Sequence, residues 1–308
     1  MQIIDNIPDL PLEPCVATIG FFDGVHLGHR FLIEQVKELA KDQGLRSALI
    51  TFPIHPRQVM KSDYRPELLT TPEEKIELLK AQGVDYCIML DFTVELSQLS
   101  ALSFMKDILQ QRYNVSTLII GYDHRFGHNR SEGFEDYVRY GQQIGMNVYR
   151  AQACMIDDLN ISSSLVRTHL LEGKIDLSTR YLGYNYSIEG VVVGGYRVGR
   201  TIGFPTANLD LRESNKLIPS DGVYAVRVEV KGCLYAGMLN IGYRPTLDNG
   251  SKKSIEVHIL RFDEDIYDEK IRLYFVSRIR SEMKFSGLDE LIAQLKRDAA
   301  FVDSVLPR

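Results

Sequence analysis

Residues 20–29, GFFDGVHLGH, follow the apolar run CVATIG at residues 15–20, and this pair of segments decides how the first half of the chain folds. The apolar run has the length and composition of a buried strand, and residues 27–40 repeat apolar side chains at helical spacing. A strand that leads directly into a helix is typical of a parallel sheet, where ligands bind beyond the carboxyl ends of the strands. The sequence therefore predicts a binding loop at residues 20–29.

Strand and helix patterns alternate through the rest of the first half. Thr71 and Glu74 form a predicted capping box at the start of the helical segment TPEEKIELLK, with Pro72 at its first position. Near-continuous apolar strands separated by helices favour a doubly wound α/β domain. Further strands are predicted at residues 46–52, 84–90, 115–120 and 147–151, and further helices at 101–111 and 135–143.

The pattern changes after Gly183, which is the predicted C-cap of a short helix at residues 176–182. Short strands separated by turn residues then follow one another, which favours a small antiparallel β-barrel or a sandwich, and the chain closes with an amphipathic helix at 288–302. We therefore expect two domains, residues 1–183 and 184–308. The strands of the second domain are expected at residues 186–193, 223–230, 233–242, 254–260 and 271–279.

The composition is that of a globular protein. The 308 residues are 44% hydrophobic and 25% charged, and the formal net charge of −5 does not favour a nucleic-acid or membrane binder, since these usually carry a basic surface. The four cysteines, Cys15, Cys87, Cys154 and Cys233, lack metal-ligand spacing, so we expect buried, reduced thiols. With no signal-peptide pattern and no apolar run long enough to span a bilayer, we expect a cytoplasmic protein.

The residue types in GFFDGVHLGH suit a nucleoside triphosphate. Gly20 and Gly24 allow tight turns, and His26 and His29 share one face at a helix start, where backbone N–H groups attract anions. Gly28, between the histidines, leaves room for a base or a sugar. A single histidine is more often structural than catalytic, but two histidines at this spacing favour a site where both imidazoles face the α-phosphate.

A second phosphate site is predicted at residues 161–167, ISSSLVR. Ser162, Ser163 and Ser164 are good helix N-caps, and free N–H groups beside three hydroxyls can hold phosphate oxygens. Arg167 adds a planar guanidinium that can bind two oxygens at once. Most serine runs before helices are only caps, so this segment gains weight from the motif at residues 20–29.

The second half contains GRTIGFPTANL at residues 199–209, and the sequence has no P-loop pattern. Thr206 and Asn208 face the same side of an extended segment, where a hydroxyl and an amide oxygen could hold Mg²⁺. In the alternating strand SIEVHIL, Glu256 is a candidate general base if it lies inside a barrel. Its spacing alone favours a solvent-facing residue on an edge strand.

The first half resembles the HxGH nucleotidyltransferases, through GFFDGVHLGH, and bacterial FAD synthetases in particular. ISSSLVR resembles their ISSTxIR motif with Ser164 in place of Thr, and GYDHRFGHNRSEG at residues 121–133 resembles GxDFRFGxxRxG with His124 in place of Phe. TFPIHP at residues 51–56 resembles TFxPHP with Ile54 in place of Pro, and either a catalytic or a positioning role is open for His55.

This resemblance implies adenylyl transfer in which histidines stabilise charge on the α-phosphate while pyrophosphate leaves. The implied catalytic residues are His26, His29 and Arg167. The implied ATP-binding residues of this half are Gly20, Phe21, Phe22, Asp23, Gly28, Ser162, Ser163 and Ser164, and the implied flavin-binding residues are Asp123, Arg125 and Phe126.

The second half resembles riboflavin kinases. The matching segments, in order, are GFPTANL (203–209), GVYAV (222–226), NIGYRPT (240–246), EVHILRFDEDIYDEKI (256–271) and IRSEMKF (279–285). The chain as a whole thus resembles the bifunctional bacterial riboflavin kinase/FMN adenylyltransferases, with a Rossmann-like nucleotidyltransferase domain followed by a small antiparallel β-barrel kinase domain and a C-terminal helix. Gly194 stands where many relatives have His, and Gly195 is retained.

The kinase resemblance assigns roles to residues of the barrel. Thr206 and Asn208 would bind Mg²⁺ with ATP, beside Gly199 and Gly203, and Glu256 would remove the proton from the 5′-hydroxyl of riboflavin. Arg280 and Lys284 would contact the flavin or the closing loops. The expected ligands of the chain are therefore ATP, Mg²⁺, riboflavin, FMN and FAD.

Three functions remain to be separated. The leading hypothesis is a two-step enzyme that phosphorylates riboflavin to FMN and then adenylylates FMN to FAD. The second is an adenylyltransferase whose barrel only binds flavin, which the intact Thr206, Asn208 and Glu256 disfavour. The third is a non-enzymatic flavin- or RNA-binding regulator, and the negative net charge disfavours RNA.

Overall fold

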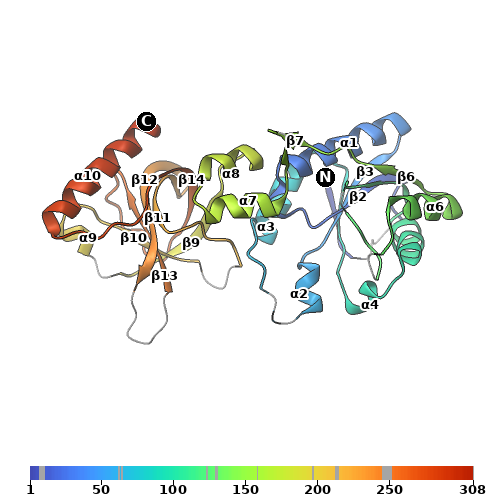
Figure 1. Ribbon diagram of the computed structural model, residues 1–308, viewed down its shortest axis with the longest axis horizontal. Coiled ribbons are helices and arrows are strands. Elements are labelled where there is room, and N and C mark those ends of the chain that lie inside the picture. Colours follow the sequence, from blue (N-terminus) through green and yellow to red (C-terminus); the bar gives the residue numbers. More distant parts are fainter. Residues whose placement is uncertain are drawn as a thin grey trace. The chain divides into compact units, whose positions relative to one another are not determined.

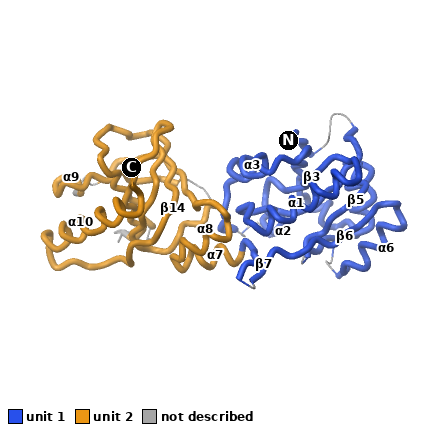
Figure 2. Tube along the Cα trace, turned by 90° about the horizontal axis from the view of Figure 1, so that it is seen from above, with its two compact units in different colours: residues 1–163 blue, residues 164–308 orange. Residues whose placement is uncertain are grey.

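The computed structural model describes residues 1–6, 11–61, 63, 65–122, 124–128, 131–157, 159–195, 198–211, 215–244 and 252–307. They form two compact units, Met1–Ser163 and Ser164–Arg308, which Figure 2 shows in separate colours. Helices α7 (Ser163–Leu171) and α8 (Ile175–Leu182) fall in the second unit by compactness, because α8 contacts the barrel strand β14 (Lys270–Arg280). A functional boundary at residue 183 stays a prediction.

The first unit is a doubly wound α/β domain, as predicted. Its six-stranded sheet has the order β1-β4-β3-β2-β5-β6, and every pairing is parallel. Figure 1 labels β2, β3 and β6 of this sheet. The order reverses beside β2, since β3 lies on one side of this strand and β5 on the other. The strands are β1 (Gln2–Ile4), β2 (Cys15–Ile19), β3 (Arg46–Thr51), β4 (Tyr86–Met89), β5 (Val115–Ile120) and β6 (Asn147–Arg150).

Helices cover both faces of this sheet. One face packs on the π-helical segment η2 (Phe104–Arg112) and on α6 (Phe134–Ile144), and the other packs on α1 (Leu27–Gln43) and α3 (Pro72–Lys80). The helix predicted at residues 101–111 forms, but most of its turns are π rather than α. The shorter elements are η1 (Asp23–Val25), α2 (Pro56–Met60), α4 (Val94–Ser97), α5 (Ala101–Ser103), β7 (Met155–Ile156) and β8 (Leu159–Asn160).

The second unit is a closed barrel rather than a sandwich. Its strand order is β10-β13-β12-β11-β14-β9, and each pairing is antiparallel. Sequence patterns predicted five of these strands and treated β10 only as an extended segment. The barrel elements not yet given are β9 (Ser187–Val193), α9 (Val198–Thr201), β10 (Ala207–Asp210), β11 (Gly222–Val230), β12 (Cys233–Arg244), β13 (Lys252–Ile259) and α10 (Leu288–Val305).

Alternate residues of the barrel strands face the interior or the outside, and α10 packs on the outside of β11 and β12. On β11, Val223 and Ala225 pack with Val302 of α10 and with its C-cap Leu306, so this set of side chains lies on the outer face. The opposite set, which includes Tyr224 and its edge-on neighbour Phe275, fills the interior.

All four thiols are free, as predicted, but burial was predicted too broadly. Cys15 and Cys87 are buried on the central strands, Cys154 is half-buried and Cys233 is exposed at the start of β12. Cys233 opens its strand beside the turn residues Lys231 and Gly232, and a residue at the tip of a hairpin has few neighbours to cover it. In the described parts of the chain, no helix has both the length and the apolar character needed to cross a membrane.

The capping box at α3 is present as predicted. The Thr71 hydroxyl accepts a hydrogen bond from the Glu74 amide at 3.2 Å, and the Glu74 carboxylate accepts one from the Thr71 amide at 3.0 Å. We expect Thr71→Ala to lower the free energy of unfolding by about 1 kcal/mol, because it removes the cap, and Thr71→Ser to stay close to the wild type. Urea unfolding of both variants checks this, and equal losses in the two would contradict it.

Candidate functional site

The loop GFFDGVHLGH is held in a tight, strained turn at the carboxyl end of β2. Phe22 and Val25 have positive φ angles of 55° and 36°, and Gly24 has φ 80°. The Asp23 carboxylate is 3% exposed and accepts hydrogen bonds from the amides of Leu69 at 2.9 Å and Thr70 at 3.1 Å. Asp23 therefore ties the loop to the segment that precedes α3. These hydrogen bonds help to hold Phe22 and Val25 in their left-handed backbone conformation.

The two histidines lie together at the start of α1. His26 is the N-cap, and its Nδ1 accepts the amide of His29 at 3.3 Å. The two imidazole rings stack, with centroids 3.6 Å apart and planes 20° apart, and Phe22 meets His29 edge-on at 5.2 Å. The prediction that His26 and His29 share one face at a helix N-terminus is met by this geometry.

The ISSSLVR segment reaches the same turn. A Cβ on Gly28 would lie 3.0 Å from the Ile161 carbonyl oxygen and 3.1 Å from the His26 ring, so glycine is needed for this close approach. The Ser163 hydroxyl donates a hydrogen bond to the Asp23 carbonyl at 2.9 Å. Gly20, Phe21, Gly28, Ser162 and Ser163 thus belong to one sheet edge in the first unit, whereas Ser164 and Arg167 lie further along α7, in the second unit.

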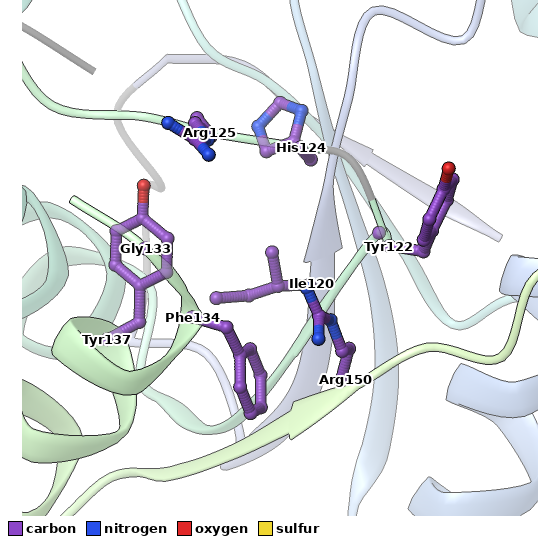
Figure 3. Close-up of a pocket in the computed structure, with 9 residues that line it drawn as sticks. Ile120, Tyr122, His124, Arg125, Gly133, Phe134, Tyr137 and Arg150 are labelled. Atoms are coloured by element: carbon purple, nitrogen blue, oxygen red, sulfur yellow. The ribbon is translucent and has the colours of Figure 1, made fainter. Parts of the chain in front are cut away.

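A cavity of about 210 Å³ opens at the carboxyl ends of β5 and β6 (Figure 3). Arg125 and His124 lie on one side of it, and Arg150 and Phe134 on the other. Phe126, a predicted flavin contact, is instead 9% exposed and stacks on Tyr137 at 4.2 Å in the core. Asp123 lies outside the described residues. The remaining lining residues are Ile120, Gly121, Tyr122, Gly133 and Tyr137.

His55 is the N-cap of α2. Its Nδ1 accepts the Arg57 amide at 3.1 Å, and its ring meets the Phe21 ring edge-on at 4.7 Å. These contacts place His55 between the loops that follow β2 and β3.

In the barrel, Glu256 lies on the outer face, with its neighbours Ile255 and Val257 buried. It pairs directly with Asn208 on one side and with Asn240 on the other. Paired residues on antiparallel strands face the same way, with Cβ atoms about 5 Å apart. The carboxylate is therefore flanked by two amides. Asn240 is absent from the predicted site residues, and only cross-strand pairing reveals its place.

The glycines near Asn208 and Thr206 form a cradle. A Cβ on Gly195 would collide with the Asn208 side-chain amide, and a Cβ on Gly199 would collide with the Phe204 carbonyl oxygen and lie 3.6 Å from the Thr206 hydroxyl. Gly203 has φ 81°, a conformation that favours glycine. Thr206 and Asn208 thus offer neutral oxygen donors in an open cradle, a donor set that fits Mg²⁺.

Arg280 and Lys284 differ in their surroundings. The guanidinium of Arg280 binds the buried Asp298 carboxylate of α10 with Nε at 2.9 Å and Nη2 at 2.8 Å. Arg280 thus joins β14 to α10, while Lys284 is exposed in the segment between them.

The comparisons with known proteins follow the same division of the chain. A family model described as FAD synthetase matches residues 10–165, and one described as riboflavin kinase matches residues 182–306. The bifunctional riboflavin kinase/FMN adenylyltransferases of Listeria monocytogenes and Escherichia coli K12 are each 38% identical to this chain. The matches cover 92% and 96% of this chain, and 90% and 94% of those proteins.

The chain belongs to the bifunctional riboflavin kinase/FMN adenylyltransferase family. The Bacillus subtilis member is 36% identical over 92% of this chain and 90% of its own length. A crystal structure described as a macrolide-efflux protein from Streptococcus pneumoniae has a TM-score of 0.88 and 31% identity, covering 97% of this chain and 98% of that one. The complete fold of this family member is thus shared with a solved structure.

Lys75 is a residue of the adenylyltransferase half that sequence reasoning missed. It is 2% exposed, and its ammonium donates hydrogen bonds to the carbonyl oxygens of Phe52 at 2.7 Å and Phe21 at 3.3 Å. The helical pattern does indicate it. Lys75 lies one turn before the buried Leu79, so the pattern places a charged side chain on the apolar face of α3.

The electrostatics of the site keep His29 neutral. Burial, followed by the charges of His26 and Lys75, holds the pKa of His29 well below its usual value. Its Nδ1 is buried without a hydrogen-bond partner among the described residues.

This shift predicts a pH-dependent loss of stability. Below pH 6.5, the ordinary pKa of histidine, the unfolded chain binds a proton at His29 that the folded chain does not, so stability falls as the pH drops. From about pH 6.5 to about pH 5.5 the loss through His29 should reach roughly 1 kcal/mol. His29→Gln should show a correspondingly shallower fall in urea unfolding. Identical slopes for the wild type and His29→Gln would contradict this.

Proposed function

We propose that this chain makes FAD in two steps: it phosphorylates riboflavin on the barrel and adenylylates the resulting FMN in the α/β unit. The observation that carries this proposal is that each unit assembles its own set of motif residues. His26, His29 and Ser163 meet at the sheet edge of the first unit. Asn208 and Glu256 pair on the barrel of the second.

In adenylyl transfer, a phosphate oxygen of FMN attacks the α-phosphorus of ATP, and the bond to the β-phosphate oxygen breaks to release pyrophosphate. His26 and His29 donate hydrogen bonds to the oxygens on which charge develops, each contributing a factor on the order of 10²–10³ in rate. The start of α1 supplies free amides for the same charge. Gly20, Phe21, Phe22, Gly28 and the serines Ser162, Ser163 and Ser164 shape the ATP site, Asp23 holds its loop, and Arg167 binds phosphate oxygens.

The flavin of the second step is assigned to the cavity at β5 and β6. Arg125 and Arg150 line it from different segments, so the cavity suits a substrate that carries phosphate and polar ring edges. The Arg150 guanidinium carbon lies 5.2 Å from the centroid of the Phe134 ring, which forms an aromatic wall of the cavity. Phe126 stacks on Tyr137, which lines the same cavity, and so contributes to the proposed flavin site from the core. Asp123 belongs to the same proposal.

In the kinase step, Glu256 accepts the proton of the riboflavin 5′-hydroxyl while the γ-phosphoryl group passes from ATP to that oxygen and ADP leaves. Thr206 and Asn208 would hold Mg²⁺, which neutralises phosphate charge. Gly195, Gly199 and Gly203 keep the backbone around these side chains open. Arg280 and Lys284 are proposed to contact the flavin or the closing loops.

The setting of the protein is also a proposal. The four free thiols support a reducing compartment, and we infer the cytoplasm. The ligands are then small molecules, namely riboflavin, FMN, ATP and the product FAD.

Product analysis tests the proposed function. Purified protein with riboflavin and Mg·ATP should yield FMN and FAD, with one ADP for each phosphorylation and one pyrophosphate for each adenylylation. Formation of FAD only from added FMN would favour an adenylyltransferase whose barrel merely binds flavin. Formation of neither flavin nucleotide would overturn the proposal.

Two variants should separate the steps. We expect Glu256→Gln to lower FMN formation by about 10²–10⁴-fold, the usual contribution of a general base. Its conversion of added FMN to FAD should not change. Conversely, His26→Ala should lower FAD formation by about 10²–10³-fold and spare the kinase step. The exposed Glu264→Gln is the matched control, and FMN formation at the wild-type rate by Glu256→Gln would refute the role of Glu256.

A further inference from the structure

The ammonium group of Lys75 is buried, which is unusual for a lysine, and it lies against the strained loop at residues 20–29. It extends from α3 to the carboxyl edge of the sheet and bonds to Phe21, in the loop after β2, and to Phe52, directly after β3. It also lies 4.1 Å from the centroid of the Phe21 ring. One cation therefore contacts both loops that frame the predicted ATP site.

Burial of this charge is costly. Desolvation lowers the pKa of Lys75 to about 8, although the nearby Asp23 acts in the opposite direction. An apolar side chain such as methionine could fill the same space on α3 without this penalty. The presence of a buried charge at Lys75 therefore indicates a role beyond packing.

The surroundings of His29 define that role. The His26 ring stacks on His29, and Phe22 covers its edge. Lys75 approaches from α3, and Asp23 and Cys87 face Lys75 in turn. Burial raises the pKa of the Cys87 thiol to about 11, so Cys87 carries no charge at neutral pH. Asp23 also accepts the amides of Leu69 and Thr70, and Lys75 is the cation whose charge acts on His29 together with that of His26.

We propose that Lys75 is a positioning residue for adenylyl transfer: its ammonium ties the loop after β2 to the loop after β3 and keeps positive charge behind His29. The tie sets the position of the Phe21–His29 turn against which ATP binds. The charge keeps the His29 ring neutral, with one N–H free to donate. This inference rests on the proposed adenylyl transfer.

The test compares Lys75→Met with Lys75→Arg and with a control, Lys80→Met, which removes an exposed lysine from the end of the same helix. We expect Lys75→Met to lower kcat for FMN adenylylation by about 10- to 100-fold, as misplacement of reacting groups does. Riboflavin phosphorylation by the same samples should stay within about twofold of the wild type. Lys75→Arg keeps the charge and should recover part of the adenylylation rate.

A second measurement is independent of activity. The ring resonances of His29, followed by NMR against pH, should titrate at higher pH in Lys75→Met than in the wild type, because a repelling cation has been removed. Lys80→Met should titrate like the wild type. Wild-type adenylylation by Lys75→Met with an unmoved His29 titration would overturn the proposal, as would unfolding of the first unit, which would reduce Lys75 to a structural role. If the wild type itself makes no FAD from FMN and ATP, the proposed function fails instead.

Discussion

The carboxylate of Asp23 is the constraint on which the first unit depends. It is buried, and it collects the amides of Leu69 and Thr70 directly before α3 begins. Its own backbone carbonyl receives the Ser163 hydroxyl from a segment 140 residues away. One acidic residue thus brings the histidine turn, the helix that carries Lys75 and the serine segment to a single place. Without this anchor, the left-handed residues Phe22 and Val25 would lose the contacts that offset their strain.

In the second unit, the polar candidate residues lie on the outside of the barrel. A six-stranded barrel is too narrow to admit a substrate, because its own side chains fill the interior. The polar residues Asn208, Glu256 and Asn240 consequently form a row on the outside, across three neighbouring strands. The alternation of its strand alone favoured a solvent-facing Glu256 on an edge strand; Glu256 does face outward, but its strand is paired on both sides. The ion pair between the half-buried Arg280 and the buried Asp298 holds α10 against the same barrel.

The sequence predicted the layout of both units because it depends on local patterns. Short stretches of sequence are enough to recognise the apolar strands, the Thr71 capping box and the end of α8 at Gly183. What it missed depends on partners far along the chain. The pairing of Asn240 with Glu256 needs the barrel register, and the burial of Phe126 under Tyr137 needs the packing of α6. The site residues that were predicted without a contact in the structure, such as Lys284, remain predictions.

The outward position of Glu256 has a consequence for how the barrel works. Ligands that bind on its outer wall need no strand to separate, so the hydrogen-bonded cylinder can persist unchanged through each turnover. With ligands bound in this way, only the segments that border the wall would have to move. The barrel strands can then be highly stable while the bordering segments stay adaptable for ligand exchange. This separation relieves the usual conflict between stability and activity.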